Sequence, residues 1–302
     1  MLTGVHLLLT YACNFECEHC FLYCGPAARG TFTIDQIQAV LEEAQRLGTI
    51  ETVFFEGGEP FLYYPLVLEG IERAGRLGIK SGIVTNGYWA TSAADAELWL
   101  RPVQQRGVAT INVSDDALHY GEPAGVHAQR VTEAAAAVGM AAKIMCAERP
   151  KVIPPDPASP EGSPARVGGG VMFRGRAVEK LSAGLPGRPW ESMKICPHEN
   201  LGSPGRVHVD CYGHVHLCQG LSMGNFWQTP LSQLVREYRG EGHPIAGPLI
   251  AGGPAELVRQ YALPHQEEYV DECHLCFEAR RALIGRFPQY LGPPQVYGLA
   301  TG

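Results

Sequence analysis

The sequence predicts an α/β protein built on a parallel sheet. Five short apolar, partly β-branched runs recur in the first half of the 302-residue chain, and such runs are typical of buried strands. Helix-length amphipathic stretches separate them, so strand and helix alternate roughly every thirty residues, which is the pattern of βαβ units. Parallel strands of this kind form either a doubly wound sheet or a barrel, and periodicity alone does not choose between the two forms.

The five strands are predicted at Val5 to Thr10 (VHLLLT), Thr52 to Phe55 (TVFF), Ser81 to Val84 (SGIV), Thr110 to Val113 (TINV) and Ala142 to Met145 (AKIM). The helices between them have recognisable ends. Thr33 and Gln36 fit a capping box at the start of the first helix. Glycines stand where helix C-caps belong, at Gly48, Gly78, Gly107 and Gly139.

The second half of the chain is less regular. Residues 148–170 are rich in Pro and Gly, which indicates a long loop or linker. Beyond it, residues 171–173 (VMF) predict a sixth strand, and a helix is predicted over 176–181. Alternating apolar residues over 206–225 predict a β-hairpin that turns at Tyr212-Gly213.

The C-terminal stretch predicts one helix and a tail. Residues 277–286 (FEARRALIGR) predict a helix whose basic face we expect to be solvated. Residues 287–302 contain three prolines and predict an extended tail that packs over the neighbouring structure.

Composition excludes several classes of protein. Basic and acidic residues number 24 and 31, and without a run of Lys or Arg there is no electrostatic reason to expect affinity for nucleic acid or anionic lipid. No apolar run is long enough to span a bilayer, and the N-terminus lacks the charged, apolar and small-residue segments that follow one another in a signal peptide. We therefore expect a cytoplasmic protein with neither nucleic acid nor membrane as a partner.

Ten cysteines in a reducing compartment are poor disulfide formers, so closely spaced ones indicate metal or redox chemistry. Cys13, Cys17 and Cys20 follow the first strand with the spacing C-x3-C-x2-C. Three thiolates can hold three irons of a [4Fe-4S] cluster and leave the fourth iron open. Zinc stays an alternative, with Cys24 as a fourth ligand, whereas we expect Cys146 to be a core thiol.

The same residues resemble the radical S-adenosylmethionine (SAM) enzymes. The resemblance rests on the C-x3-C-x2-C loop, with His19 where the family usually carries an aromatic or His against the adenine. It also rests on the GGEP motif after the second strand, at Gly57, Gly58, Glu59 and Pro60, which in the family contacts the methionine amino group.

The resemblance implies a partial (β/α)6 TIM-like barrel as the fold. It implies a [4Fe-4S] cluster on Cys13, Cys17 and Cys20 whose open iron chelates SAM, and reductive cleavage of SAM to a 5'-deoxyadenosyl radical. An external flavodoxin- or ferredoxin-like electron donor is then needed. The alternative from another class is a non-catalytic zinc-binding structural protein, which does not explain why GGEP stands at the same sheet edge as the cysteines.

Further SAM contacts are expected at the ends of later strands, where related enzymes place polar side chains. The candidates are Asn86, Ser114 and Asp116, with Arg130 and Lys143 as partners for the SAM carboxylate. Helix capping is an equally strong interpretation of Ser114 and Asp116, because both residue types favour N-caps.

A second set of cysteines follows the Pro/Gly-rich loop, at Cys196, Cys211, Cys218, Cys273 and Cys276. A C-x2-C pair with earlier cysteines also suits a zinc ribbon. The set resembles, however, the auxiliary-cluster region of SPASM and twitch radical SAM enzymes, through a G-x4-C at 213–218, a Gly-Asn pair at 224–225 and a preceding GRA at 175–177.

The full seven-cysteine SPASM pattern is absent, so the resemblance implies the twitch form with one auxiliary [4Fe-4S] cluster. Its implied ligands are Cys196, Cys218, Cys273 and Cys276. The implied domains are a core barrel over 1–183 and an auxiliary-cluster domain over 184–302. Cys211 and Cys24 are surplus. Cys211 is a substitute ligand, a buried thiol or a catalytic hydrogen-atom donor, and Cys24 lines the rim of the active site, where it is the other candidate catalytic donor.

An auxiliary cluster held by four cysteines favours electron transfer, which implies oxidative modification or maturation of a peptide or protein. A dehydrogenase or an epimerase acting on a peptide or small molecule is the alternative. Because only four residues precede the first predicted strand, we expect recognition of a peptide leader to need a separate protein or the C-terminal region.

Overall fold

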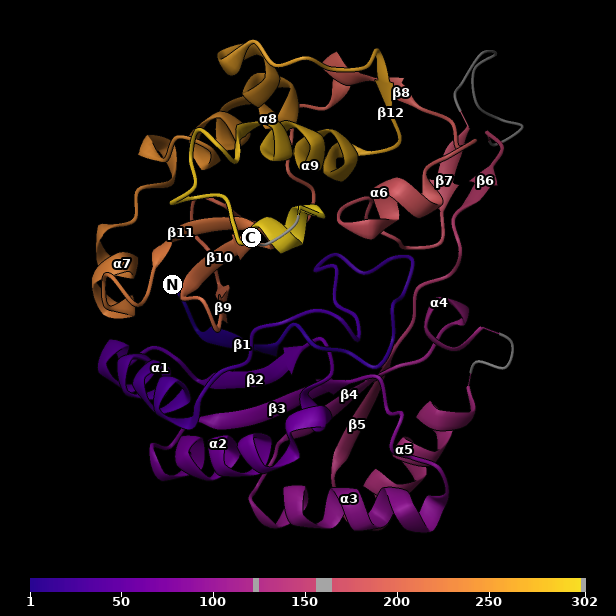
Figure 1. Ribbon diagram of the computed structural model, residues 1–302, viewed down its shortest axis with the longest axis vertical. Helices are drawn as coiled ribbons and strands as arrows, with labels where there is room; N and C mark the ends of the chain where they lie inside the picture. The colour runs from indigo at the N-terminus through magenta and orange to yellow at the C-terminus, as the bar shows by residue number, and fades with distance from the viewer. Residues whose placement is uncertain (122–124, 156–164, 300–302) are drawn as a thin grey trace.

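The computed structural model describes residues 1–121, 125–155 and 165–299 (Figure 1). One eight-stranded sheet forms its centre, with the strand order β11-β10-β9-β1-β2-β3-β4-β5. The strands are β1 (Gly4–Thr10), β2 (Thr52–Gly57), β3 (Lys80–Thr85), β4 (Thr110–Ser114), β5 (Ala141–Met145), β9 (Arg206–Asp210), β10 (His214–Cys218) and β11 (Leu221–Asn225). Each of the five strands predicted in the first half is confirmed.

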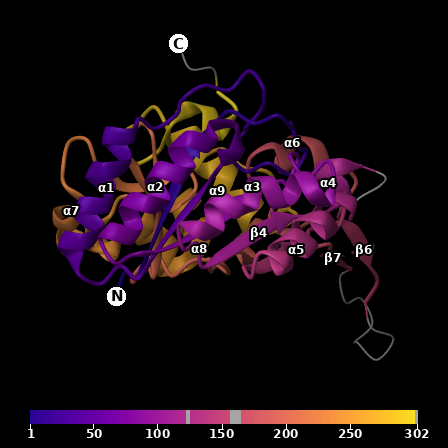
Figure 2. The same ribbon diagram turned by 90° about the horizontal axis from the view of Figure 1, so that it is seen from below.

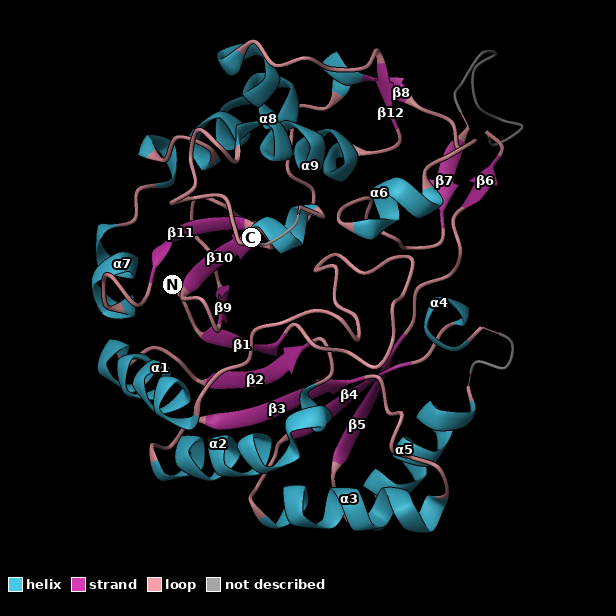
Figure 3. Ribbon diagram, viewed as in Figure 1, coloured by secondary structure: helices cyan, strands magenta, loops and turns pink. Residues whose placement is uncertain are grey.

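Helices cover one face of the parallel part of this sheet (Figure 3). They are α1 (Ile34–Leu47), α2 (Tyr64–Arg76), α3 (Ala93–Gln105) and α5 (Val126–Ala137), with the short α4 (Ala117–Tyr120) before the last of them. The capping box at Thr33 is confirmed, and α1 ends at Gly48 in the left-handed conformation with φ 69°. Val5, Leu7 and Leu9 of β1 are fully buried, because alternate residues of a strand point to the helix-covered face.

The predicted α/β class with a parallel sheet is confirmed, and the sheet stays open as a partial barrel with β5 and β11 at its edges. Six strands are parallel, but the sixth is not the one predicted. Val171–Phe173 is irregular, whereas β9 pairs with β1 in parallel register, His6 opposite His208. Phe173 is buried and its backbone N–H donates to Asp271 Oδ2 at 3.3 Å, so this segment packs against the C-terminal half instead of joining the ladder.

The Pro/Gly-rich segment is also more ordered than predicted. Within 148–170, β6 (Lys151–Ile153) and β7 (Arg166–Gly168) form an antiparallel pair, and residues 156–164 lie outside the described residues. Figure 2 shows this pair projecting from the end of the molecule. Hairpin pairing satisfies the backbone of a segment whose composition alone indicates a loop.

The C-terminal half packs around the β9–β11 end of the sheet (Figure 1). Its remaining elements are α6 (Arg176–Leu181), β8 (Arg188–Pro189), α7 (Leu231–Glu237), α8 (Ala246–Tyr261), β12 (Glu268–Tyr269) and α9 (Glu272–Leu283), with α8 kinked at Gly252-Gly253. The predicted hairpin turning at Tyr212-Gly213 is confirmed as β9 and β10.

Two expectations for the C-terminus have different outcomes. The predicted helix over 277–286 belongs to α9, which begins earlier, and its Arg280 is only 2% exposed instead of solvated. The tail packs back on the sheet, as predicted, with Tyr297 Oη donating to the carbonyl of Gly220 at 2.7 Å. It is not extended throughout, because Pro294–Tyr297 forms a 3-10 helix, and residues 300–302 of the predicted tail lie outside the described residues. In the described part of the chain, no helix has the length and apolar character needed to cross a membrane.

Candidate functional site

The loop that follows β1 carries the first three cysteines of the C-x3-C-x2-C motif. Backbone hydrogen bonds fold it over the sheet edge, from Cys13 N–H to the carbonyl of Gly25 and from Cys20 N–H to that of Cys17, both at 3.1 Å. Two amides donate to thiol sulfurs, Phe15 N–H to Cys13 Sγ and Cys24 N–H to Cys20 Sγ, each at 3.4 Å. Such N–H···S bonds stabilise a thiolate that ligates iron.

The three thiols of the loop differ in pKa. Burial, with a smaller contribution from the neighbouring cysteines, raises the pKa of Cys13 to about 11 and that of Cys17 to about 12. A hydrogen bond with the Cys24 side chain lowers the pKa of Cys20 to about 6. The thiols of Cys13 and Cys17 therefore hold their protons at neutral pH until a metal displaces them. Three thiols on one short loop are a donor set that fits a [4Fe-4S] cluster.

The GGEP motif lies directly against this loop. Gly58 N–H donates to the carbonyl of Thr10 at 2.7 Å, and Glu59 N–H donates to that of Ala12 at 3.0 Å. A Cβ on Gly58 would lie 2.1 Å from the Ala12 carbonyl oxygen, so only glycine permits this approach. Two motifs whose nearest residues, Cys20 and Gly57, lie 37 positions apart in the sequence thus form one edge of the site.

Glu59 is a buried carboxyl of this edge whose orientation is fixed by hydrogen bonds. It is fully buried and accepts from Phe61 N–H, from Thr85 Oγ1 and from Asn86 N–H at 2.8 to 2.9 Å. Burial raises its pKa from 4.5 to about 7 despite these donors. Asn86 extends the network, because its Nδ2 donates to Asn14 Oδ1 at 2.9 Å.

The remaining predicted SAM contacts divide into two groups. Asp116 caps α4, as the alternative interpretation predicted, and lies 2.8 Å from His119 Nδ1. Ser114 is buried at the end of β4. His19 meets His119 edge to face, with ring centroids 4.7 Å apart, and burial lowers the pKa of His19 to about 4, so the ring is neutral.

Arg130 and Lys143 are not brought into this group. Arg130 lies on α5 and donates to the carbonyl of Ala90 at 3.2 Å. Lys143 lies on the edge strand β5 and is exposed. Their assignment to the SAM carboxylate stays a prediction that no contact in the described residues supports.

The GRA element clamps the cysteine loop. Arg176 is 6% exposed and donates to the carbonyl of Cys17 at 2.6 Å and to that of Cys24 at 2.8 Å. Gly175 has φ 61°, and a Cβ there would lie 2.5 Å from Phe21 Cα. The sequence pattern indicated this element but not its role in holding the loop.

A second cysteine cavity lies between α9 and the hairpin. Its lining includes the four predicted auxiliary ligands, Cys196, Cys218, Cys273 and Cys276. Burial raises the pKa of Cys276 to about 11 and also raises that of Cys273. Four thiols that line one cavity match the donor set of a [4Fe-4S] cluster, and the same set also suits zinc.

Two arginines lie beside these thiols. Sequence reasoning did not identify them as site residues. Arg174 Nη1 donates to Cys218 Sγ at 3.0 Å. Arg280 is buried beside the cysteines and donates to the carbonyls of Cys276 and Gln219. The sequence feature that could have revealed Arg280 is its spacing: it lies four residues after Cys276 on one helix, which places both side chains on the same face.

The other cysteines are placed as follows. Cys24 is buried within the first loop and Cys211 is buried just after β9, where a Cβ on Gly30 would lie 2.8 Å from its sulfur. Cys146 is exposed, so the expectation of a core thiol is wrong. The reason is that it follows β5, which forms an edge of the sheet and has no neighbouring strand to cover it.

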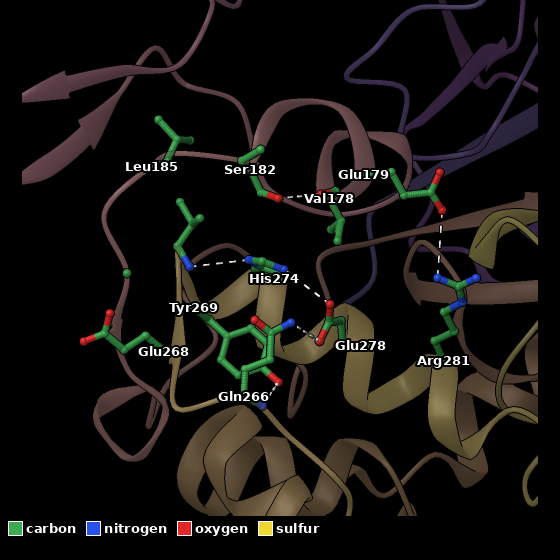
Figure 4. Close-up of a pocket in the computed structure, with 13 residues that line it drawn as sticks. Val178, Glu179, Ser182, Leu185, Gln266, Glu268, Tyr269, His274, Glu278 and Arg281 are labelled. Carbon is green, nitrogen blue, oxygen red and sulfur yellow. Dashed lines mark hydrogen bonds and ion pairs between the residues drawn. The ribbon is translucent and has the colours of Figure 1, made fainter.

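Another face of α9 lines an open pocket (Figure 4). His274, Glu278 and Arg281 of α9 face Glu179 of α6 and Ser182, the residue after α6, across it. Helical periodicity separates these residues from Cys273 and Cys276 on the same helix. The pocket is therefore distinct from the cysteine cavity.

Comparisons with known proteins give one family match and several relatives. Residues 7–127 match the model of the Radical SAM superfamily. The chain is 25% identical over 115 residues to "Putative peptide biosynthesis protein YydG" of Bacillus subtilis (strain 168), covering 38% of this chain and 36% of the relative. It is 27% identical over 115 residues to the tungsten-containing aldehyde ferredoxin oxidoreductase cofactor-modifying protein of Pyrococcus furiosus, covering 38% and 31%.

The chain thus spans about a third of the length of these curated relatives. Among solved structures, BtrN in complex with AdoMet and 2-DOIA aligns with a TM-score of 0.46 at 15% identity, over 78% of this chain and 83% of BtrN. Members of the superfamily bind a [4Fe-4S] cluster and SAM. The C-x3-C-x2-C loop and the GGEP motif both lie inside the range of this chain that matches the Radical SAM superfamily model.

Proposed function

We propose that this chain is a twitch-type radical SAM enzyme that oxidatively modifies a peptide or protein. The observation that carries the proposal is the second cysteine cavity, because four thiols there match an auxiliary [4Fe-4S] cluster in addition to the SAM-binding one. The name of the relative YydG, a peptide biosynthesis protein, supports a peptide substrate. We assign residues 1–183 to the SAM core and 184–302 to the auxiliary-cluster region.

The first site supplies the radical chemistry. When bound, the cluster and SAM provide a 5'-deoxyadenosyl radical, with the reducing electron from an external flavodoxin- or ferredoxin-like donor. In this proposal the cluster ligands are Cys13, Cys17 and Cys20. Residues assigned to SAM are His19, Gly57, Gly58, Glu59, Pro60, Asn86, Ser114 and Asp116. Glu59 accepts from the SAM amino group, and neutral His19 packs on the adenine.

The second site accepts an electron. A substrate that loses a hydrogen atom to the radical becomes itself a radical, and full oxidation requires that it lose one more electron and one proton. Four cysteine ligands leave the auxiliary cluster without an open iron, which favours electron transfer over substrate ligation. Arg174 and Arg280 place positive charge beside these thiolates, which favours reduction of the cluster.

A second candidate function is epimerisation of a peptide or small molecule. Cys211 follows β9, the parallel neighbour of β1, so it lies at the same edge of the sheet as Cys13. A thiol there would return a hydrogen atom to the substrate radical, and no net oxidation would follow. Cys24 is the other thiol available for this role.

Iron analysis and SAM cleavage test the proposal. After anaerobic reconstitution, we expect about eight irons per chain. A variant with Cys13, Cys17 and Cys20 changed to Ala should keep about four irons and lose deoxyadenosine formation under dithionite. A variant with Cys273 and Cys276 changed to Ala should lose about four irons and keep deoxyadenosine formation.

Stoichiometric zinc instead of iron would contradict the enzyme and support the zinc-binding structural protein. About four irons in the wild-type chain with active SAM cleavage would remove the auxiliary cluster from the proposal.

A further inference from the structure

Three side chains from three adjacent strands converge on the face of the sheet opposite α1 and α2. Phe55 of β2 faces the helices, because a Cβ on Gly70 of α2 would lie 2.5 Å from its ring. Glu56, the next residue, therefore points to the other face. His6 of β1 and His208 of β9 lie opposite each other in the parallel register and point to this same inner face.

The distances between the three groups are short. Glu56 Oε2 lies 3.2 Å from His6 Nδ1, and Oε1 lies 3.0 Å from His208 Nε2. One ligand atom from each of the three residues falls within 4.8 Å of the other two. Phe54 stacks on the His6 ring with centroids 4.8 Å apart and planes 17° apart, which fixes the orientation of that ring.

Hydrogen bonding accounts for part of this cluster, because burial acts to raise the pKa of Glu56 but its interactions with His208 and His6 hold that pKa well below its usual range. His6 Nδ1 is buried and has no aligned hydrogen bond, although the Glu56 oxygen is near. A nitrogen lone pair that is close to a carboxylate but not paired with it is poorly satisfied, unless a cation lies between them.

A neighbouring cluster of the same composition shows the contrast. Asp210, with His214 and His216, accepts hydrogen bonds from Tyr11 Oη at 2.8 Å and from the amides of Tyr212 and His214. His216 Nδ1 accepts from Gly220 N–H at 3.2 Å. These bonds hold the β9–β10 hairpin, so the Asp210 carboxylate is already well supplied with hydrogen-bond donors.

Two imidazoles and one carboxylate are the donor set of catalytic zinc sites and of non-haem Fe(II) sites, both of which keep positions open for exogenous ligands. The three side chains here are 18%, 15% and 8% exposed for His6, Glu56 and His208, so the group is sheltered but not sealed. With two neutral imidazoles and one carboxylate, a divalent ion would retain one positive charge.

We propose that His6, Glu56 and His208 bind one divalent transition-metal ion, separate from both cysteine sites, which holds a hydroxyl or carboxylate oxygen of the substrate. Glu56 directly precedes Gly57 of the GGEP motif, so the ion lies beside the residues assigned to SAM. Its place near the radical source would hold an oxygen-bearing carbon within reach of hydrogen abstraction. The substrate role rests on the proposed function, whereas metal binding does not.

Manganese binding to the cluster-loaded full chain tests the proposal. Mn²⁺ prefers carboxylate oxygen over thiolate, so surplus cysteines do not compete. Oxidised [4Fe-4S] clusters are diamagnetic, and loss of the free Mn²⁺ signal in electron paramagnetic resonance reports binding. Without SAM or reductant, we expect one Mn²⁺ per wild-type chain and at least about tenfold weaker binding in Glu56→Gln.

His208→Gln provides an independent ligand variant, and His214→Gln is the matched control from the saturated cluster. Iron content shows whether each variant keeps its fold. The proposal is overturned if the wild-type chain binds no Mn²⁺, if Glu56→Gln and His208→Gln retain their clusters and bind as tightly as wild type, or if His214→Gln loses binding equally while retaining its clusters. Mn²⁺ binding without deoxyadenosine formation would refute the proposed function and leave the metal site standing.

Discussion

At the scale of single residues, Glu59 couples the candidate SAM site to pH. Burial raises its pKa from 4.5 to about 7, so the carboxyl is neutral below that pH and charged above it. The charged form is the stronger hydrogen-bond acceptor for an amino group. Three donors already orient the side chain, which leaves its protonation as the main variable.

We therefore expect SAM to bind the cluster-loaded protein more tightly as pH rises from 6 to 8, with a contribution from Glu59 of up to about tenfold per pH unit below pH 7. Glu59→Gln should bind more weakly throughout and show a flatter profile. Isothermal titration at several pH values measures both. Parallel profiles for the two proteins would show that another group titrates.

Arg174 has a different consequence, because it donates directly to the sulfur of Cys218. A hydrogen bond and a positive charge at a cluster sulfur stabilise the reduced cluster. Arg174→Met should shift the potential of the proposed auxiliary cluster to more negative values by on the order of 50 mV, the equivalent of a charged hydrogen bond.

Redox titration followed by electron paramagnetic resonance measures this shift. Arg281→Met is the matched control, because Arg281 lies on α9 but is 40% exposed and faces Glu179. An equal shift in both variants would trace the effect to general charge instead of the N–H···S contact.

At the scale of elements, the start of α6 and the loop after β1 form one unit. Arg176 is buried and satisfies two carbonyls of the loop, at Cys17 and Cys24. Its removal leaves buried acceptors unpaired, which costs about 1–3 kcal/mol for each. The loop that carries the first cysteines therefore depends on a residue more than 150 positions later.

We expect Arg176→Met to lower the iron retained by the N-terminal cysteines and to slow deoxyadenosine formation by at least about tenfold. Arg188→Met, a partly exposed arginine of β8, should leave both unchanged. Iron content and the initial rate of deoxyadenosine release provide the comparison. Full activity in Arg176→Met would show that the loop holds its shape through the backbone alone.

At the scale of the whole molecule, local signals predicted the βα units, and long-range pairing determined the rest. The strand at Val5 to Thr10 was predicted from its own apolar run, whereas its pairing with β9 depends on two segments two hundred residues apart. Residues 171–173 carry a good strand pattern and yet form none, because Phe173 packs on the C-terminal half.

The candidate site shows the same division. Cys13, Cys17, Cys20 and the GGEP motif were found from spacing, because their chemistry is local. Arg280 was expected at the surface, since a charged helix face is usually solvated, but neighbouring cysteines hold it inside. His6, Glu56 and His208 gave no sequence signal as a group, because sheet register alone brings three isolated strand residues together.

The pairing of β1 with β9 has a consequence for synthesis on the ribosome. Until residues 206–210 leave the exit tunnel, the central strand presents one bare edge of backbone donors and acceptors, and such edges recruit strands from other chains. Chains halted after residue 183 should therefore aggregate, whereas chains that include β9 should remain dispersed. The nascent protein is therefore most prone to aggregation after its first cysteine loop has left the exit tunnel and before β9 has paired with β1.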